Sequence, residues 1–216
     1  LGMASDLVVV AGAEIRIGPA KGSIGHVNTF PMSANHAVPI LGDASPAEGL
    51  GVLRRHHNAT MQDTQPFIIQ LNHPRGIQFQ PAKRFRTDAH ALFEELSFGP
   101  GLSIDEQTDP RARAVDPISG RSIFDFDAIE VMNRFSIEAW RRVRGDWFAL
   151  MNRGFQITGT GNADSHTAQL ERMGFPMNLV EKGDGSIGGF LRSIESGKVR
   201  VSSGPLVDLV ITSPST

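Results

Sequence analysis

The stretch from Glu138 to Thr160, EAWRRVRGDWFALMNRGFQITGT, decides the fold class of this chain. Apolar residues recur at helical spacing in its first part, which predicts an amphipathic helix over Glu138 to Arg153 with Gly154 as its C-terminal stop. Phe155 to Thr160 then alternates and carries β-branched residues, which predicts a strand. Another strand-like segment, Phe126 to Asn133, precedes the helix. We therefore expect a parallel βαβ unit.

The same rhythm of strands and helices extends outward in both directions. Further strands are predicted at Leu7 to Ala11, His26 to Met32, Pro66 to Arg75, Asn178 to Val180 and Val199 to Ser203, and helices at Pro46 to Gln62 and Ser186 to Ser196. Within the Pro46 helix, His56 and His57 are interpreted as surface residues. This alternation is typical of an α/β protein with a parallel sheet.

Two parts of the chain depart from this rhythm. The segment from Gly76 to Phe124 has few apolar repeats and is interrupted by a short helix at Asp88 to Leu96; we expect Asp105 to Arg121 to be mobile. The tail Leu206 to Thr212 alternates as an extra strand. We expect residues 1–205 to form one domain, and residues 206–216 to be a strand-like tail at the start of a following β-domain.

Composition limits the chemistry that the chain can perform. The 216 residues are 40% hydrophobic, enough for one sizeable core, and their net charge of −2 gives no support for binding nucleic acid or an anionic membrane. No apolar run reaches the roughly 20 residues of a membrane span, so we expect a soluble protein, cytoplasmic or periplasmic. The chain has no cysteine. Any metal would therefore be held by nitrogen and oxygen ligands.

The residues that follow the Phe155 strand carry the strongest chemical pattern. Asp164 and His166 are two positions apart in GTGNADSHT, so both side chains point to the same side if the segment is extended. A carboxylate and an imidazole converging there suit Zn²⁺, Mn²⁺ or Fe²⁺. The alternative is that Asp164 caps the next turn and His166 is a surface histidine.

Other candidate ligands fall at or beside the ends of predicted strands. They are Glu14, His26, His73 and Glu130. In barrels of parallel strands, residues at the C-terminal strand ends converge on one mouth, so this placement favours a metal site. Taken alone, Glu14 could instead pair with Arg16, and His36 has the context of a surface residue.

Five segments together resemble the polymerase and histidinol phosphatase (PHP) superfamily, and most closely its CehA/McbA-type metallohydrolases. In chain order they are Gly12-Ala13-Glu14, Gly25-His26-Val27-Asn28, Leu71-Asn72-His73-Pro74-Arg75, Phe126-Asp127-Ala128-Ile129-Glu130-Val131 and Gly161-Asn162-Ala163-Asp164-Ser165-His166. The resemblance runs from about Leu7 to Pro205.

The resemblance implies a distorted (β/α)₇ barrel that holds two or three divalent metal ions. It implies that the ligands include Glu14, His26, His73, Asp164 and His166. It leaves Glu130 in a supporting position near the mouth and makes Arg75 a candidate for gripping an anionic oxygen. The family's domain begins with an H-x-H strand that this sequence lacks. We therefore expect a barrel that is incomplete at its N-terminal side, with an exposed strand edge.

These observations predict a metal-dependent hydrolase that acts on a small phosphate ester, or on a related carbamate or carboxylic ester. Asp164, His166 and Arg75 are the expected catalytic residues, with His166 moving a proton to the leaving group. The alternative is a catalytically inactive PHP-like domain that serves as a binding or assembly module. The missing H-x-H segment favours that alternative.

Overall fold

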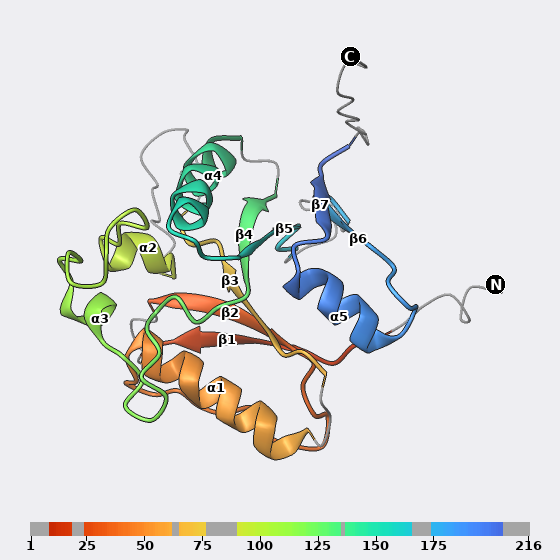
Figure 1. Ribbon diagram of the computed structural model, residues 1–216, viewed down its shortest axis with the longest axis horizontal. Coiled ribbons are helices and arrows are strands. Elements are labelled where there is room, and N and C mark those ends of the chain that lie inside the picture. The colour runs from red at the N-terminus through yellow and green to blue at the C-terminus, as the bar shows by residue number, and fades with distance from the viewer. Residues whose placement is uncertain are drawn as a thin grey trace, which may run out of the picture.

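The computed structural model describes residues 9–18, 24–61, 65–76, 90–134, 137–165 and 174–204 (Figure 1). Its strands are β1 (Ala13–Ile17), β2 (Gly25–Phe30), β3 (Ile68–Asn72), β4 (Ala128–Asn133), β5 (Thr158–Asn162), β6 (Met177–Val180) and β7 (Val199–Ser202). Its helices are α1 (Pro46–Thr60), α2 (Leu92–Glu95), α3 (Pro110–Arg113), α4 (Ile137–Asn152) and α5 (Ile187–Glu195). None of these helices has the length and apolar character needed to cross a membrane.

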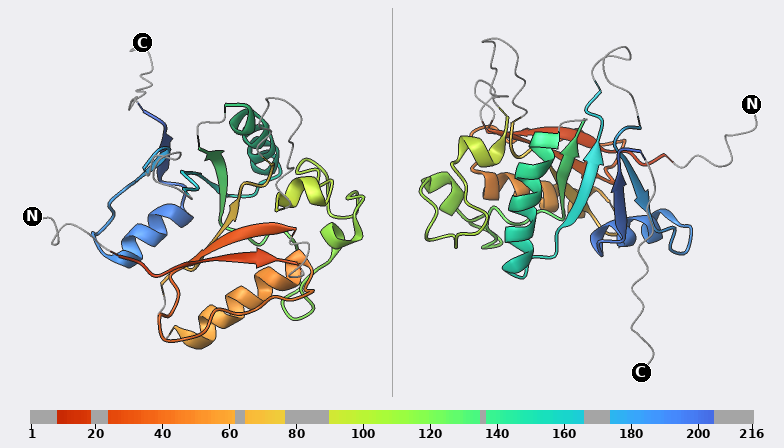
Figure 2. Two further views of the ribbon diagram at one scale, coloured as in Figure 1. Left: turned by 180° about the vertical axis from the view of Figure 1, so that it is seen from behind. Right: turned by 90° about the horizontal axis from the view of Figure 1, so that it is seen from above.

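The strands form two sheets. The larger sheet has the order β1-β2-β3-β4-β5, and β6 pairs with β7 in a separate antiparallel ribbon. β3, β4 and β5 run parallel, as expected for the βαβ unit around α4. Figure 2 shows α4 beside β4 and β5, and the β6–β7 ribbon beyond β5. The chain is therefore an α/β protein with a mixed sheet.

The prediction that all strands of the sheet run parallel is wrong at β1 and β2. β1 pairs with β2, and β2 pairs with β3, in antiparallel fashion, and the larger sheet does not close on itself. Of the strand predicted at Leu7 to Ala11, the described residues Val9 to Ala11 form no strand, and β1 begins at Ala13. Only seven residues separate β1 from β2. A connection this short suits antiparallel neighbours, because a parallel crossover takes a dozen residues or more.

The larger sheet has two chemically different faces. On one face, Ile15, Val27 and Leu71 join a core cluster with Leu50 of α1 and Val143 of α4. Because side chains alternate along a strand, Glu14, His26, Asn28, Gln70 and Asn72 lie on the opposite face. The apolar face therefore anchors the sheet to its helices. The polar face carries the side chains that could bind a ligand.

Helix α1 is fixed behind β1 and β2 by its cap and its apolar stripe. The Ser45 hydroxyl accepts the Glu48 N–H, and the Glu48 carboxylate accepts the Ser45 N–H at 2.8 Å, a capping box. His57, which we predicted on the surface, is 5% exposed and stacks on Phe67 with ring centroids 4.3 Å apart. It lies four residues after the buried Leu53, on the same stripe of the helix.

The segment expected to be mobile is instead packed against the body. Gln107, Ala112 and Asp116 are each at most 2% exposed. The Asp116 carboxylate accepts the guanidinium of Arg55 at 2.7 Å and the hydroxyl of Ser119 at 2.6 Å. The sequence pattern gave no sign of this packing, because the contact with Arg55 is polar and joins residues 61 positions apart. The expected tail at Leu206 to Thr212 lies outside the described residues.

Asp116 makes the free energy of unfolding depend on pH in the acid range. Arg55, the largest cause, and Ser119 together lower the pKa of Asp116 to about 2 from the ordinary 3.8. The stability that this ionised carboxylate contributes is complete above its unfolded-state pKa and is lost as pH falls from about 4 through about 2. We expect Asp116→Asn to unfold at a lower urea concentration than the parent at pH 7. The gap should narrow by pH 2.5, since Asn does not titrate, and a gap that is constant with pH would contradict this role.

Candidate metal centre

Three predicted ligands meet on the polar face of the sheet. Nδ1 of His26 lies 3.3 Å from Oε1 of Glu14, and Nε2 of His73 lies 4.0 Å from the same oxygen. Their ligand atoms all lie within 4.8 Å of one another. The three residues come from β1, from the start of β2 and from the position after β3. Strand pairing brings these positions together, because His26 lies opposite Asn72 in the register of β2 and β3.

The spacing of these atoms fits a divalent ion. Two ligand atoms about 2.1 Å from a tetrahedral zinc ion lie roughly 3.4 Å apart, which matches the separation of His26 from Glu14 and is slightly below that of His73 from Glu14. Two imidazoles and one carboxylate are also the donor set of several zinc enzymes with an open coordination position. Glu14 remains 49% exposed at its side chain. The group is therefore accessible from solvent.

Electrostatics keep the Glu14 carboxylate ionised. Its hydrogen bond to His26 is the largest cause that lowers the pKa of Glu14, to about 2, and Asn72 and His73 act in the same direction against the effect of burial. Asn72 Nδ2 also donates to Glu14 Oε1 at 3.1 Å. Glu14 thus faces His26, His73 and Asn72 rather than the Arg16 that the sequence left as an alternative. A carboxylate that stays charged is a ready metal ligand.

Glu130 holds the backbone beside the three-residue group through buried hydrogen bonds. Its Oε2 accepts the backbone N–H of His73 at 2.5 Å and the Asn133 amide at 3.1 Å. His73 has a φ of +26°, a strained value for a residue with a side chain, and the Glu130 bond helps to hold it there. Glu130 is 2% exposed, and burial raises its pKa to about 7. Glu130 therefore fixes the backbone that presents the His73 imidazole.

Asp164 does not join the three-residue group. Its carboxylate accepts Nη2 of Arg134 at 3.1 Å, and its backbone carbonyl accepts the same nitrogen at 3.2 Å. Both residues follow the C-terminal ends of neighbouring parallel strands, β5 and β4, so Asp164 is on the expected side of the sheet. It is near enough to Glu130 to raise the pKa of that residue. His166 lies outside the described residues.

Arg75 is engaged with protein rather than held open for a substrate. Its guanidinium donates to both carboxylate oxygens of Asp146 on α4, at 2.7 and 3.1 Å, and lies over the Phe93 ring. It also donates to the carbonyl oxygens of Phe93 and Phe98. In this arrangement Arg75 braces α4 and α2 against the end of β3. Gripping a substrate oxygen would require it to leave Asp146.

Sequence reasoning missed His90, which stacks on His26 with ring centroids 4.4 Å apart and planes 18° apart. It precedes α2 in a segment without apolar periodicity, so no pattern marked it. The supporting amides were also missed. Asn28, Gln70 and Asn72 could have been found, because once β2 and β3 are assigned, alternation puts these amides on the face of His26.

Comparisons of the chain with protein-family models, with curated proteins and with solved structures found no match. The resemblance to the PHP superfamily therefore depends on the motifs quoted from the sequence.

Asp164 offers a test of how far the site extends beyond the three-residue group. We expect Asp164→Asn to lower about tenfold the turnover of an aryl ester that the family resemblance implies, because an amide carries no charge for an ion or for Arg134. The fold should be nearly unchanged, since Asn adopts the φ of +47° as readily as Asp. Turnover, bound metal and thermal melting are measured together. If turnover and metal content both survive, Asp164 serves only as a partner of Arg134.

Proposed function

We propose that this chain is a metal-dependent hydrolase that cleaves a phosphate ester, or a related carbamate or carboxylic ester, with metal-activated water. The observation that carries the proposal is the convergence of three side chains on the polar face of the sheet: the ligand atoms of Glu14, His26 and His73 lie within 4.8 Å of one another. A carboxylate and two imidazoles, with room for a further ligand, form a donor set suited to Zn²⁺, Mn²⁺ or Fe²⁺.

A bound divalent ion supplies Lewis acidity, which activates water and polarises the bond to be cleaved. The chain's own residues set the geometry. Glu14, His26 and His73 would hold the ion, Asn72 would orient the Glu14 carboxylate, and Glu130 would fix the backbone of His73. A histidine, His166 or His90, would carry a proton to the leaving group.

We further propose that the sheet is part of a PHP-like barrel holding two or three ions. The parallel order of β3, β4 and β5 supports this, as does the placement of His73, Arg134 and Asp164 just after their C-terminal ends. Residues at these ends of parallel strands face a common mouth. The polar side chains of β1 and β2 add to that mouth from the antiparallel side.

Hydrolysis under metal control tests the proposal. The purified chain is assayed with 4-nitrophenyl acetate and 4-nitrophenyl phosphate, before and after removal of metal by a chelator and after return of Zn²⁺ or Mn²⁺. We expect turnover of at least one substrate, its loss on chelation and its recovery with metal. Turnover that is unchanged after treatment with the chelator would rule out a metal-dependent reaction.

The second candidate is a catalytically inactive PHP-like module that binds or assembles with other domains. The ion pair of Arg75 with Asp146 favours it, because Arg75 is the cation expected to grip the substrate and Asp146 already binds it. This module would bind metal or a partner and hydrolyse neither ester under any metal condition. The same assay therefore separates the two candidates.

A further inference from the structure

A second hollow opens beside the metal group on the same face of the sheet. It measures about 170 Å³ and lies between the amide-bearing strands β2 and β3, the end of β5, the ribbon strands and α5. Its lining consists of Asn28, Phe30, Gln70, Thr160, Asn162, Asn178, Val180, Phe190, Ile194 and Val199. None of these ten side chains carries a charge, although the neighbouring group is built from Glu14 and two histidines.

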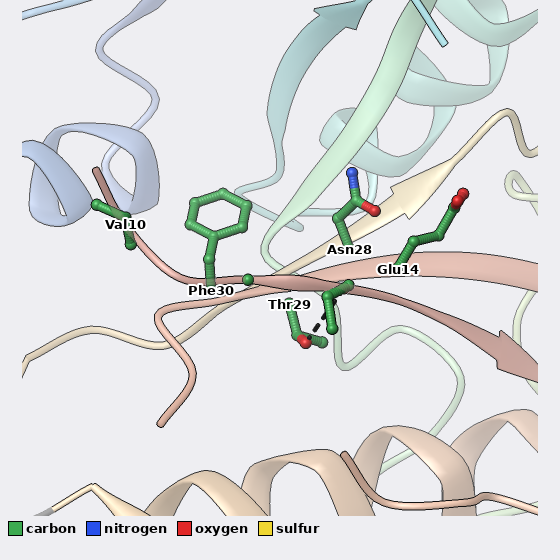
Figure 3. Close-up of a pocket in the computed structure, with 7 residues that line it drawn as sticks. Val10, Glu14, Asn28, Thr29 and Phe30 are labelled. Carbon is green, nitrogen blue, oxygen red and sulfur yellow. Dashed lines mark hydrogen bonds between the residues drawn. The ribbon is translucent and has the colours of Figure 1, made fainter. Parts of the chain in front are cut away.

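The two hollows share a wall. A shallower depression of about 400 Å³ beside Glu14 is also lined by Asn28 and Phe30. Figure 3 shows Glu14, Asn28 and Phe30 rising from the same face of β1 and β2, while Thr29 points to the opposite face. A ligand lying over Asn28 could therefore reach both the metal group and the uncharged hollow.

The polarity of the amides is fixed by Glu14. The Asn72 NH₂ donates a hydrogen bond to Oε1 of Glu14 at 3.1 Å. That NH₂ also donates to Asn28 Oδ1 at 2.9 Å, and Asn72 Oδ1 accepts Nε2 of Gln70 at 2.9 Å. Asn28 is thus left with an NH₂ to offer, and Gln70 with a carbonyl oxygen. Figure 3 shows the Asn28 oxygen on the side nearer Glu14 and the Asn28 nitrogen pointing away from the strands.

The opposite wall is apolar. Phe190 and Ile194 come from α5, while Val180 and Val199 come from the ribbon. Asn178, the polar residue on that side, is already committed, because its amide bonds both the N–H and the carbonyl of Gly161 at 2.8 Å. The sheet side of the hollow therefore offers hydrogen-bonding groups, the Asn28 NH₂ and the Gln70 carbonyl oxygen among them, and the other side offers apolar surface.

We propose that this hollow, the amide pocket, binds an uncharged planar group of the substrate that carries both a hydrogen-bond acceptor and a donor, as a carboxamide does. The inference rests on the proposed hydrolase function and deepens it, since it assigns the part of the ester that is not cleaved. A carbonyl oxygen would accept from Asn28, an N–H would donate to Gln70, and an apolar body would contact Phe190 and Val180. A charged group is disfavoured, because no ion pairs with it there and burial removes its hydration.

Three small ligands of one shape test the pocket. Benzamide has the acceptor and the donor, acetophenone replaces its NH₂ by a methyl group, and benzoate replaces it by a negative oxygen. Binding is measured by NMR titration on the metal-stripped chain, so that benzoate cannot coordinate an ion. We expect benzamide to bind about tenfold more tightly than acetophenone, and at least about tenfold more tightly than benzoate.

A substitution that fills the pocket with a larger side chain gives a second test. Val180→Phe should abolish benzamide binding, and zinc content and thermal melting show whether its metal group and fold are intact. Val115→Phe is the matched control, since Val115 is 48% exposed and outside the pocket. The comparison of ligands on the parent chain stands by itself if Val180→Phe does not fold.

The outcomes separate this inference from the hydrolase proposal. Benzamide binding without turnover of either 4-nitrophenyl ester would leave the pocket standing and remove the hydrolase function. Turnover without benzamide binding, or equal binding of benzamide and benzoate, would overturn the pocket. Benzamide binding that persists in a folded Val180→Phe chain would also overturn it, because the ligand would then bind elsewhere.

Discussion

We expect Glu14→Gln to abolish binding of the proposed metal ion and, with it, the proposed hydrolytic activity. Glutamine has nearly the shape of glutamate but carries no charge, so it loses the carboxylate that faces both His26 and His73. Loss of a charged ligand should weaken metal binding more than about 100-fold, beyond the 10–100-fold typical of supporting residues. Because the Glu14 side chain is 49% exposed, the fold should change little.

Metal per chain after dialysis and turnover of the aryl ester are the two readouts for Glu14→Gln. Glu138→Gln makes the same chemical change at an exposed position on α4 and should match the parent in both. A Glu14→Gln chain that keeps its metal and its turnover would show that Glu14 only forms an ion pair with His26.

Glu130→Leu should destabilise the fold and loosen the site together. Leucine leaves the His73 N–H and the Asn133 amide without their buried acceptor, which costs about 1–3 kcal/mol in free energy of unfolding. It also releases the backbone of His73 from its strained φ, so metal affinity should fall by about 10–100-fold.

Glu130→Gln is the matched control, because its side-chain oxygen can still accept the His73 N–H. We expect it to retain most of the stability and most of the metal affinity. Urea unfolding and zinc titration measure the two quantities. Equal losses in the Leu and Gln variants would mean that the charge of Glu130, and not its hydrogen bond to His73, is what matters.

Local pattern predicted much of the fold. The apolar stripe from Trp140 to Leu150 and the glycine after it located α4, and the β-branched runs located β3, β4 and β5 within a few residues. The pairing of β1 and β2 could not be found this way. An apolar run shows that a strand is buried but does not reveal which strand lies beside it or in which direction.

The candidate site was predictable to the extent that it follows strand ends. Glu14, His26 and His73 were expected together and are together. Asp164 was expected with them because of its motif, but the structure brings it to Arg134, which reaches it from the turn after β4. A pairing between two turns 30 residues apart leaves no periodic trace in the sequence.

The metal content of the parent chain, compared with that of Glu14→Gln and His26→Ala, tests the central claim most directly. Each protein is dialysed against Zn²⁺ or Mn²⁺, freed of excess ion and subjected to elemental analysis. The metal centre predicts about one tightly held ion per parent chain at the three-residue group, and loss of that ion in both variants. A folded parent chain that binds neither ion, or variants that bind as much as the parent, would contradict the metal centre and the hydrolase function built on it.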